Sequence, residues 1–228
     1  MVTINSSDVA VGRKRPLFIY ITGCDGTGKS TQAQLLLQQL KTVGLTTCHL
    51  WLRFPFFFSL PLLIYARWRG MSWYEMTDNV RHGYWDFRNS RLMRRLFPWT
   101  LLVDATWAAL WKVYLPLWQG KSIVCERFVL DMLVDMALAF DQEMHQTVVG
   151  QLFLRLLPDQ TQIFILDLDA FTVCERRTDL RLDKRLPDRL AAFKRLTRDL
   201  NLTVLSSQQP IHELNESILN FVEVKYDR

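Results

Sequence analysis

The stretch LFIYITGCDGTGKSTQ, residues 17–32, decides the fold. Its apolar start, Leu17–Thr22, predicts a buried strand that leads directly into Gly23–Ser30, where every fixed position of the phosphate-loop pattern GxxxxGK[ST] is satisfied. A helix-period stretch, Lys29–Val43, follows. This order suits phosphate binding, because glycines let successive backbone N–H groups surround an anion at a helix N-terminus. The loop therefore predicts a nucleotide-binding site.

The side chains of this loop have separate expected roles. Lys29 can reach the β- and γ-phosphates, Ser30 offers a hydroxyl to Mg²⁺, and Thr31 can assist at the α-phosphate. The loop indicates a nucleotide but no reaction, since ATPases, GTPases and small-molecule kinases share it. No guanine-reading NKxD string follows, and 228 residues are few for a motor ATPase, so a small-molecule kinase is the leading class. The expected ATP-binding residues are Gly23, Cys24, Asp25, Gly26, Thr27, Gly28, Lys29, Ser30 and Thr31.

Further along the chain, short apolar runs alternate with longer helix-period stretches. The alternation predicts an α/β fold, a doubly wound five-stranded parallel sheet flanked by helices. We expect a flexible tail at 1–15 and a single domain at 16–228. The remaining predicted strands are Thr46–Leu52, Ser122–Glu126, Gln162–Leu168 and Leu202–Ser206, and the remaining helical stretches are 59–118, 129–157, 171–200 with a break, and 211–224.

Composition narrows the class of ligand. The chain has 28 Lys and Arg against 23 Asp and Glu, a net charge of +5, which favours phosphorylated small molecules without requiring nucleic acid. The four cysteines form no CxxC pair and predict free thiols in a reducing compartment, by default the cytoplasm. The four histidines lack metal-ligand spacing, so no structural zinc is expected.

All eight tryptophans lie between Trp51 and Trp118, within or beside a segment, 54–118, that we expect to be helical and rich in aromatic residues. Trp107, Trp111, Tyr114 and Trp118 share one helical face. The main interpretation is packing on the sheet or on a second subunit of a homodimer, and the alternative is peripheral contact with a membrane. A membrane span is not expected, because the apolar run 54–66 is too short.

Beyond the loop, the sequence resembles the thymidylate kinase family of nucleoside monophosphate kinases over most of its length. The loop is similar to the family's GxDxxGKSTQ, Leu52–Pro55 to its LRFP form, and Glu126–Phe128 to its DR[YF] motif with Glu in place of Asp. The stretches at 158–161, 167–169 and 175–177 are similar to its PDLT, LDxD and ERxxxR patterns. The resemblance implies ATP as phosphoryl donor, Mg²⁺, and dTMP as acceptor.

The resemblance also implies roles for single residues. Asp25 would contact the sugar hydroxyl of the acceptor, and Arg53 would hold its phosphate; Ser30 and Glu126 would serve the metal, although a structural pair of Glu126 with Arg127 stays an alternative. For Asp167 and Asp169, at the end of a predicted strand, we expect a capping or structural role. The expected acceptor-binding residues are Asp25, Arg53, Phe54 and Arg127, and the expected catalytic residues are Lys29, Arg127, Glu126 and the lid residues Arg176 and Arg177.

One family feature is out of place. The family carries an aromatic that stacks on thymine and an Arg four residues later, whereas the corresponding positions are near 102–103 and 106–107 and hold neither in order. The pattern F-x-x-x-R does occur at Phe87–Arg91, but its use requires an insertion before the third strand. Three alternatives stay open: a kinase for another phosphorylated or lipid-linked acceptor, a deoxynucleoside kinase, and a non-catalytic nucleotide-binding module near a membrane.

Overall fold

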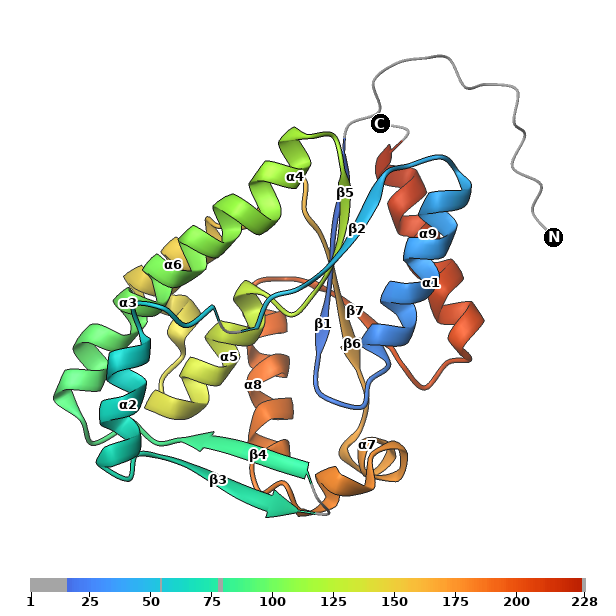
Figure 1. Ribbon diagram of the computed structural model, residues 1–228. Coiled ribbons are helices and arrows are strands. Elements are labelled where there is room, and N and C mark those ends of the chain that lie inside the picture. The colour runs from blue at the N-terminus through green and yellow to red at the C-terminus, as the bar shows by residue number, and fades with distance from the viewer. Residues whose placement is uncertain (1–15, 54, 78–79, 227–228) are drawn as a thin grey trace.

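The computed structural model describes residues 16–53, 55–77 and 80–226. The predicted tail 1–15 and the predicted acceptor residue Phe54 lie outside these described residues. Five parallel strands form one sheet in the order β2-β5-β1-β6-β7 (Figure 1). The predicted five-stranded parallel α/β fold is confirmed. The strands are β1 Phe18–Gly23, β2 Thr47–Trp51, β5 Ser122–Glu126, β6 Gln162–Asp167 and β7 Thr203–Ser206.

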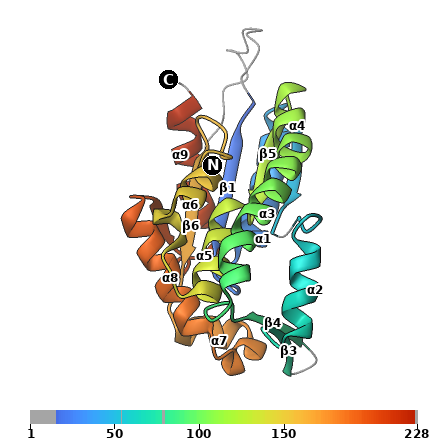
Figure 2. The ribbon, with the colours of Figure 1, turned by 90° about the vertical axis from the view of Figure 1, so that its left-hand side faces the viewer.

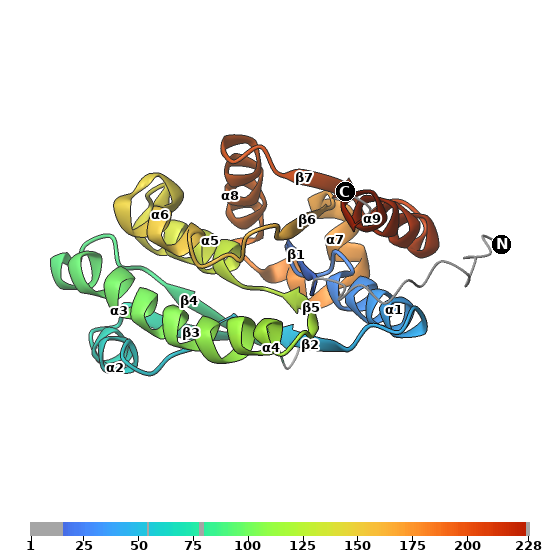
Figure 3. The same cartoon turned by 90° about the horizontal axis from the view of Figure 1, so that it is seen from above.

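Helices cover both faces of the sheet (Figure 3). One face packs on α1 and α9, and the other packs on a layer that contains α3, α5, α6 and α8. β1 contributes to both cores, since Ile19 and Ile21 belong to the first and Phe18 and Tyr20 to the second, as strand alternation requires. The helices are α1 Lys29–Thr42, α2 Leu60–Trp68, α3 Arg91–Ala109, α4 Leu115–Trp118, α5 Val129–Phe140, α6 Val148–Leu154, α7 Ala170–Arg176, α8 Leu186–Asp199 and α9 Ile211–Tyr226.

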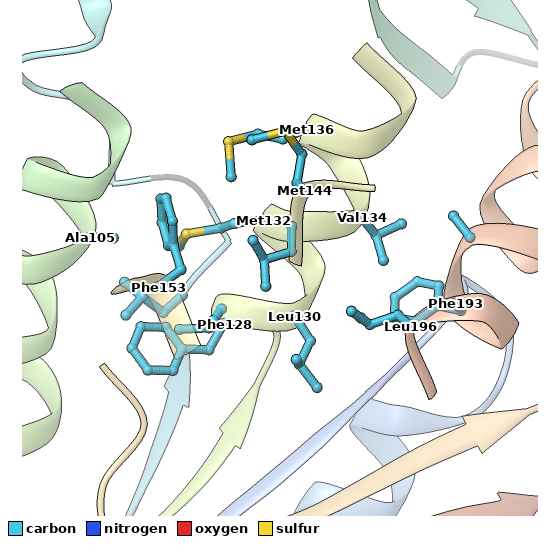
Figure 4. Close-up of a cluster of buried hydrophobic side chains, with 14 of the residues drawn as sticks. Ala105, Phe128, Leu130, Met132, Val134, Met136, Met144, Phe153, Phe193 and Leu196 are labelled. Atoms are coloured by element: carbon cyan, nitrogen blue, oxygen red, sulfur yellow. The ribbon is translucent and has the colours of Figure 1, made fainter. Parts of the chain in front are cut away.

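Helix α5 lies at the centre of the larger core. Its side chains Met132 and Val134 point to opposite sides, where they meet residues of α6 and α8 such as Phe153 and Phe193 (Figure 4). The predicted helical stretch 129–157 is interrupted after α5, where Asp141 takes a left-handed conformation at φ 52°. The predicted break within 171–200 is confirmed, because a 3₁₀ segment, Thr178–Leu182, separates α7 from α8.

The segment 54–118 is not wholly helical, so that prediction is wrong in its middle. Between α2 and α3 the chain forms an antiparallel hairpin of β3 Ser72–Thr77 and β4 Val80–Trp85. Aromatic side chains decide this outcome, because they favour strands and pair across them. The rings of Trp73 and Tyr84, which face each other in the ladder, stack with centroids 5.8 Å apart.

A long helix follows the hairpin. α3 continues through a π-helical turn, Leu110–Tyr114, into α4. The interpretation that its aromatic stripe packs on the sheet is wrong, because Trp107 is 61%, Trp111 56% and Trp118 75% exposed. Only Tyr114 of the predicted stripe is partly covered, and its hydroxyl donates to the Leu156 carbonyl at 3.4 Å.

Candidate nucleotide-binding site

The glycine loop joins the carboxyl end of β1 to the first turn of α1. Gly23 has φ +138°, and a Cβ there would lie 2.3 Å from the carbonyl oxygen of Leu166 on the neighbouring strand β6. Gly28 precedes α1 at φ +86° and would meet nothing within 4 Å. The first position therefore needs glycine for close approach, and the second for a left-handed conformation. Both requirements are those of a loop that presents backbone N–H groups at a helix N-terminus.

Lys29 is buried inside this loop rather than extended into solvent. Its Nζ donates to the carbonyl oxygen of Cys24, which also accepts from Thr27 Oγ1 at 2.9 Å. Burial, helped by the positive charge of Arg127, lowers the pKa of Lys29 to about 8. A bound anion would favour the charged ammonium, so the loop contains a cation that a phosphate can stabilise.

Ser30 and Glu126 meet, although 96 residues separate them. Ser30 Oγ donates to Glu126 Oε2 at 2.6 Å, and the other carboxylate oxygen is hydrogen-bonded to His49 Nε2 at 2.6 Å. The strand β5 lies between β2 and β1 and runs parallel to both. Ser30, in the loop region after β1, and Glu126, at the end of β5, therefore meet at the carboxyl edge of the sheet, and His49 reaches Glu126 from the middle of β2. A hydroxyl and a carboxylate oxygen are ligands that Mg²⁺ accepts alongside nucleotide phosphates, so the residues present fit that metal.

Arg127 takes a strained conformation beside the loop, with φ 60° in the left-handed region. Its guanidinium is buried and forms ion pairs with Asp25 and, at 3.2 Å, with Asp131. Burial disfavours ionisation of Asp25, but Arg127 and Lys29 outweigh it and hold the pKa of that carboxyl well below its usual range. The two residues expected to contact an acceptor are thus joined directly.

Asp131, in the first turn of α5, holds Arg127 from behind. Its Oδ2 accepts from Tyr20 at 2.8 Å and from Thr22 at 2.7 Å, both on β1. Because the carboxylate is buried and fully engaged, Arg127 has a fixed position relative to the glycine loop.

Arg53 follows β2 and faces the same region. It forms a two-pronged contact with Asp135 of α5, with Nε 3.2 Å from Oδ2 and Nη2 3.4 Å from Oδ1. Burial opposes its charge, but the carboxylates of Asp135 and Asp25 raise the pKa of Arg53. Arg189 of α8 adds a further buried cation: it pairs with Asp183 at 3.0 Å, its field lowers the pKa of Asp25, and its Nε has no hydrogen-bond partner among the described residues.

The two predicted lid residues, Arg176 and Arg177, contact different parts of the structure. Arg177 lies against the loop, 3.4 Å from where a Cβ on Gly26 would be, and pairs with Asp179 at 2.7 Å. Arg176 of α7 donates to the Ser207 carbonyl at 2.8 Å, beyond β7. Asp169 accepts from the Thr172 backbone N–H at 2.9 Å, so its predicted capping role is confirmed.

The segment that follows α7 is attached to the hairpin. Tyr84 donates to Asp183 at 3.1 Å, and Arg185 donates to the Trp85 carbonyl at 2.6 Å while its guanidinium lies over the Trp73 ring at 5.8 Å. The hairpin, which the sequence did not predict, therefore contacts the segment that follows the predicted lid residues Arg176 and Arg177.

The alternative position for a base-reading pair, Phe87 with Arg91, is not available for that role. Phe87 is fully buried and stacks on Trp85 with centroids 5.7 Å apart, and Arg91 is exposed at the start of α3. The residues that sequence reasoning missed are His49, Asp131, Asp135 and Arg189. Only Asp131 carried a signal, since Asp four residues after Arg127 at a helix start suits an ion pair.

The fold agrees with a solved structure. The chain is similar to the crystal structure of thymidylate kinase from Ehrlichia chaffeensis, with a TM-score of 0.54 and 16% sequence identity over 91% of this chain and 98% of that one. The fold is that of a thymidylate kinase. No family model matches the sequence, and no curated protein does. At 16% identity the likeness shows a shared fold, and the activity has to be inferred from the residues of the site.

Proposed function

We propose that this protein is an ATP-dependent nucleoside monophosphate kinase, with dTMP as the first acceptor to test (dTMP + ATP to dTDP + ADP). The contact between Ser30 and Glu126, 2.6 Å at the mouth of the glycine loop, carries the proposal. A carboxylate beside the loop hydroxyl provides a place for Mg²⁺, which phosphoryl transfer from ATP requires. The metal would neutralise charge on the β- and γ-phosphates.

Different side chains of the protein would position the phosphates of ATP and the phosphate of the acceptor. Lys29 would leave the Cys24 carbonyl for the β- and γ-phosphates, and Arg177 would lie close enough to reach the same tail. On the other side, Arg53 would exchange its contact with Asp135 for the acceptor phosphate. Arg127, held by Asp25 and Asp131, would lie between donor and acceptor. Arg189 would add positive charge above the same region.

The test is an acceptor screen. ADP release from Mg-ATP should depend on an added acceptor, with dTMP compared with other nucleoside monophosphates and with lipid-linked phosphates. Replacing Arg53 by Met should raise the KM for the acceptor by about tenfold or more while the Kd for ATP changes little. The matched control is Arg155→Met, at an exposed position directly after α6. ATP binding without acceptor-dependent turnover would favour the non-catalytic module instead.

A second candidate is a kinase for a different phosphorylated acceptor, including a lipid-linked one. The specific observation is that Phe87, the alternative position for a ring that stacks on thymine, is buried in the core. The screen separates the two candidates, because this one predicts turnover with a lipid-linked phosphate and little with dTMP.

A further inference from the structure

One side of the molecule exposes an unusual number of large apolar side chains. Trp68 is 80% and Trp118 75% exposed, although tryptophan is mostly covered in folded proteins. These side chains come from α2 with its preceding turn and from the helix 91–118, and we call them the aromatic flank. Its members are Phe57, Phe58, Ile64, Trp68, Leu92, Leu96, Trp99, Val103, Trp107, Trp111 and Trp118.

The two parts of the aromatic flank are held together by one buried carboxylate. Asp104 of α3 accepts from the backbone N–H groups of Phe57, Phe58 and Ser59 at 2.7–3.1 Å. It thereby caps the N-terminus of α2 from the neighbouring helix. Figures 2 and 3 show α2 beside the helix that α3 and α4 form. A surface fixed in this way keeps its aromatic side chains in one arrangement.

The charges on these helices have a single sign. Asp104 is the only acidic residue in 60–70 and 91–121, and it is buried. None of the exposed cations there forms an ion pair with a carboxylate of the described residues. These cations are Arg67, Arg69, Arg91, Arg94, Arg95 and Lys112. The aromatic flank therefore combines apolar rings with unneutralised positive charge.

We propose that the aromatic flank binds the surface of a membrane that contains anionic lipids. Tryptophan rings suit the level of the lipid headgroups, and arginine side chains next to them attract anionic headgroups. No helix of the described residues is long and apolar enough to cross a membrane.

Charge decides between this occupant and a second copy of the chain. A twofold dimer through the flank would bring the same patch of each copy together, cations against cations, with no exposed carboxylate of these helices to neutralise them. Burying unpaired charge is unfavourable, whereas an anionic membrane supplies the missing negative charge. The flank is therefore complementary to lipid and not to itself.

Flotation with vesicles tests the proposal. The full chain, without nucleotide, should float with vesicles of phosphatidylglycerol and phosphatidylcholine, and much less with phosphatidylcholine alone. Its tryptophan emission should shift to shorter wavelength on binding. The apparent affinity should fall about tenfold or more in Trp107→Ser with Trp111→Ser, and likewise in Arg91→Gln with Arg95→Gln. Because nucleotide is absent, failure of the kinase proposal leaves this result unaffected.

Matched controls lie on other surfaces. Phe171→Ser removes a similarly exposed ring from α7, and Lys41→Gln with Lys194→Gln removes two exposed cations from α1 and α8. Both should bind vesicles as the unchanged chain does, and circular dichroism should show all variants folded. No flotation with anionic vesicles, or equal losses in flank and control variants, would overturn the proposal. A dimer in light scattering that Trp107→Ser with Trp111→Ser dissociates would show a second copy on the flank instead.

Discussion

The glycine-loop region and the aromatic flank both depart from the usual pattern of burial: the first buries charged side chains, and the second exposes large apolar ones. Around the loop, the charged side chains of Lys29, Glu126 and Arg127 are buried, and each has a partner. On the flank, tryptophans are exposed, and no exposed cation forms an ion pair with a carboxylate in the part of the chain that the structure describes. Burying charge and exposing large apolar side chains are both unfavourable unless a ligand or a partner surface compensates for them. We therefore expect the glycine-loop region to bind an anion inside the fold and the aromatic flank to bind the surface of a membrane.

The backbone of the loop region should be the least tolerant of change. Gly23→Ala places a methyl group 2.3 Å from the Leu166 carbonyl at a φ that side chains rarely adopt, so we expect a loss of about 3–5 kcal/mol in the free energy of unfolding. The control is Gly44→Ala, also at positive φ but with nothing within 4 Å, for which about 1 kcal/mol is expected. Urea denaturation measures both. Equal losses would mean that close approach to β6 contributes nothing.

Much of this region could be predicted from the sequence because its signals are local or topological. Five apolar runs gave the strands, and the rule that parallel strands end at one edge brought Ser30 near Glu126. The partners on other elements could not be predicted: His49, Asp135 and Arg189 are ordinary polar residues until the strand order and the course of α5 and α8 are known. Packing alone reveals such long-range pairs.

The aromatic segment was predicted less well, for a different reason. Its apolar residues are dense enough to fit a helix or a strand, so periodicity could not separate the hairpin 72–85 from the helices around it. Sequence also could not show which face of 91–118 is covered, since both faces carry large apolar residues. Leu101 and Phe97 are buried, whereas Trp99 and Val103 are exposed.

Catalysis should depend on the cation inside the loop. Lys29→Ala should lower kcat by about 10²–10³, equivalent to about 3–4 kcal/mol, because it removes charge that stabilises the transferring phosphoryl group. Lys41→Ala, at the exposed end of the same helix, is the matched control and should keep full turnover. Steady-state ADP release checks this. Unchanged turnover in Lys29→Ala would remove the kinase assignment from this loop.

The flank should depend on its single buried carboxylate. Asp104→Asn keeps the shape but loses the charge that accepts from Phe57, Phe58 and Ser59, so we expect about 2 kcal/mol less stability and faster amide hydrogen exchange in α2. Asp141→Asn, exposed and in a left-handed conformation that Asn tolerates, should change stability by no more than about 0.5 kcal/mol. If the two variants match, α2 does not depend on its cap from α3.

The buried charge of Lys29 should be unfavourable for folding until an anion binds in the loop. Burial and Arg127 lower the pKa of Lys29 from 10.5 to about 8, so between these pH values the unfolded chain binds more protons than the folded one. Stability should then rise with pH across that window, by at most about 1.4 kcal/mol per unit, and level off above it. The comparison is urea unfolding of the unchanged chain against Lys29→Met, in which the other titrating groups are shared. Saturating ATP should flatten the slope, because phosphates stabilise the charged ammonium and return the pKa of Lys29 toward its usual value. A slope that persists with ATP bound would mean that Lys29 stays on the Cys24 carbonyl and never reaches the phosphates.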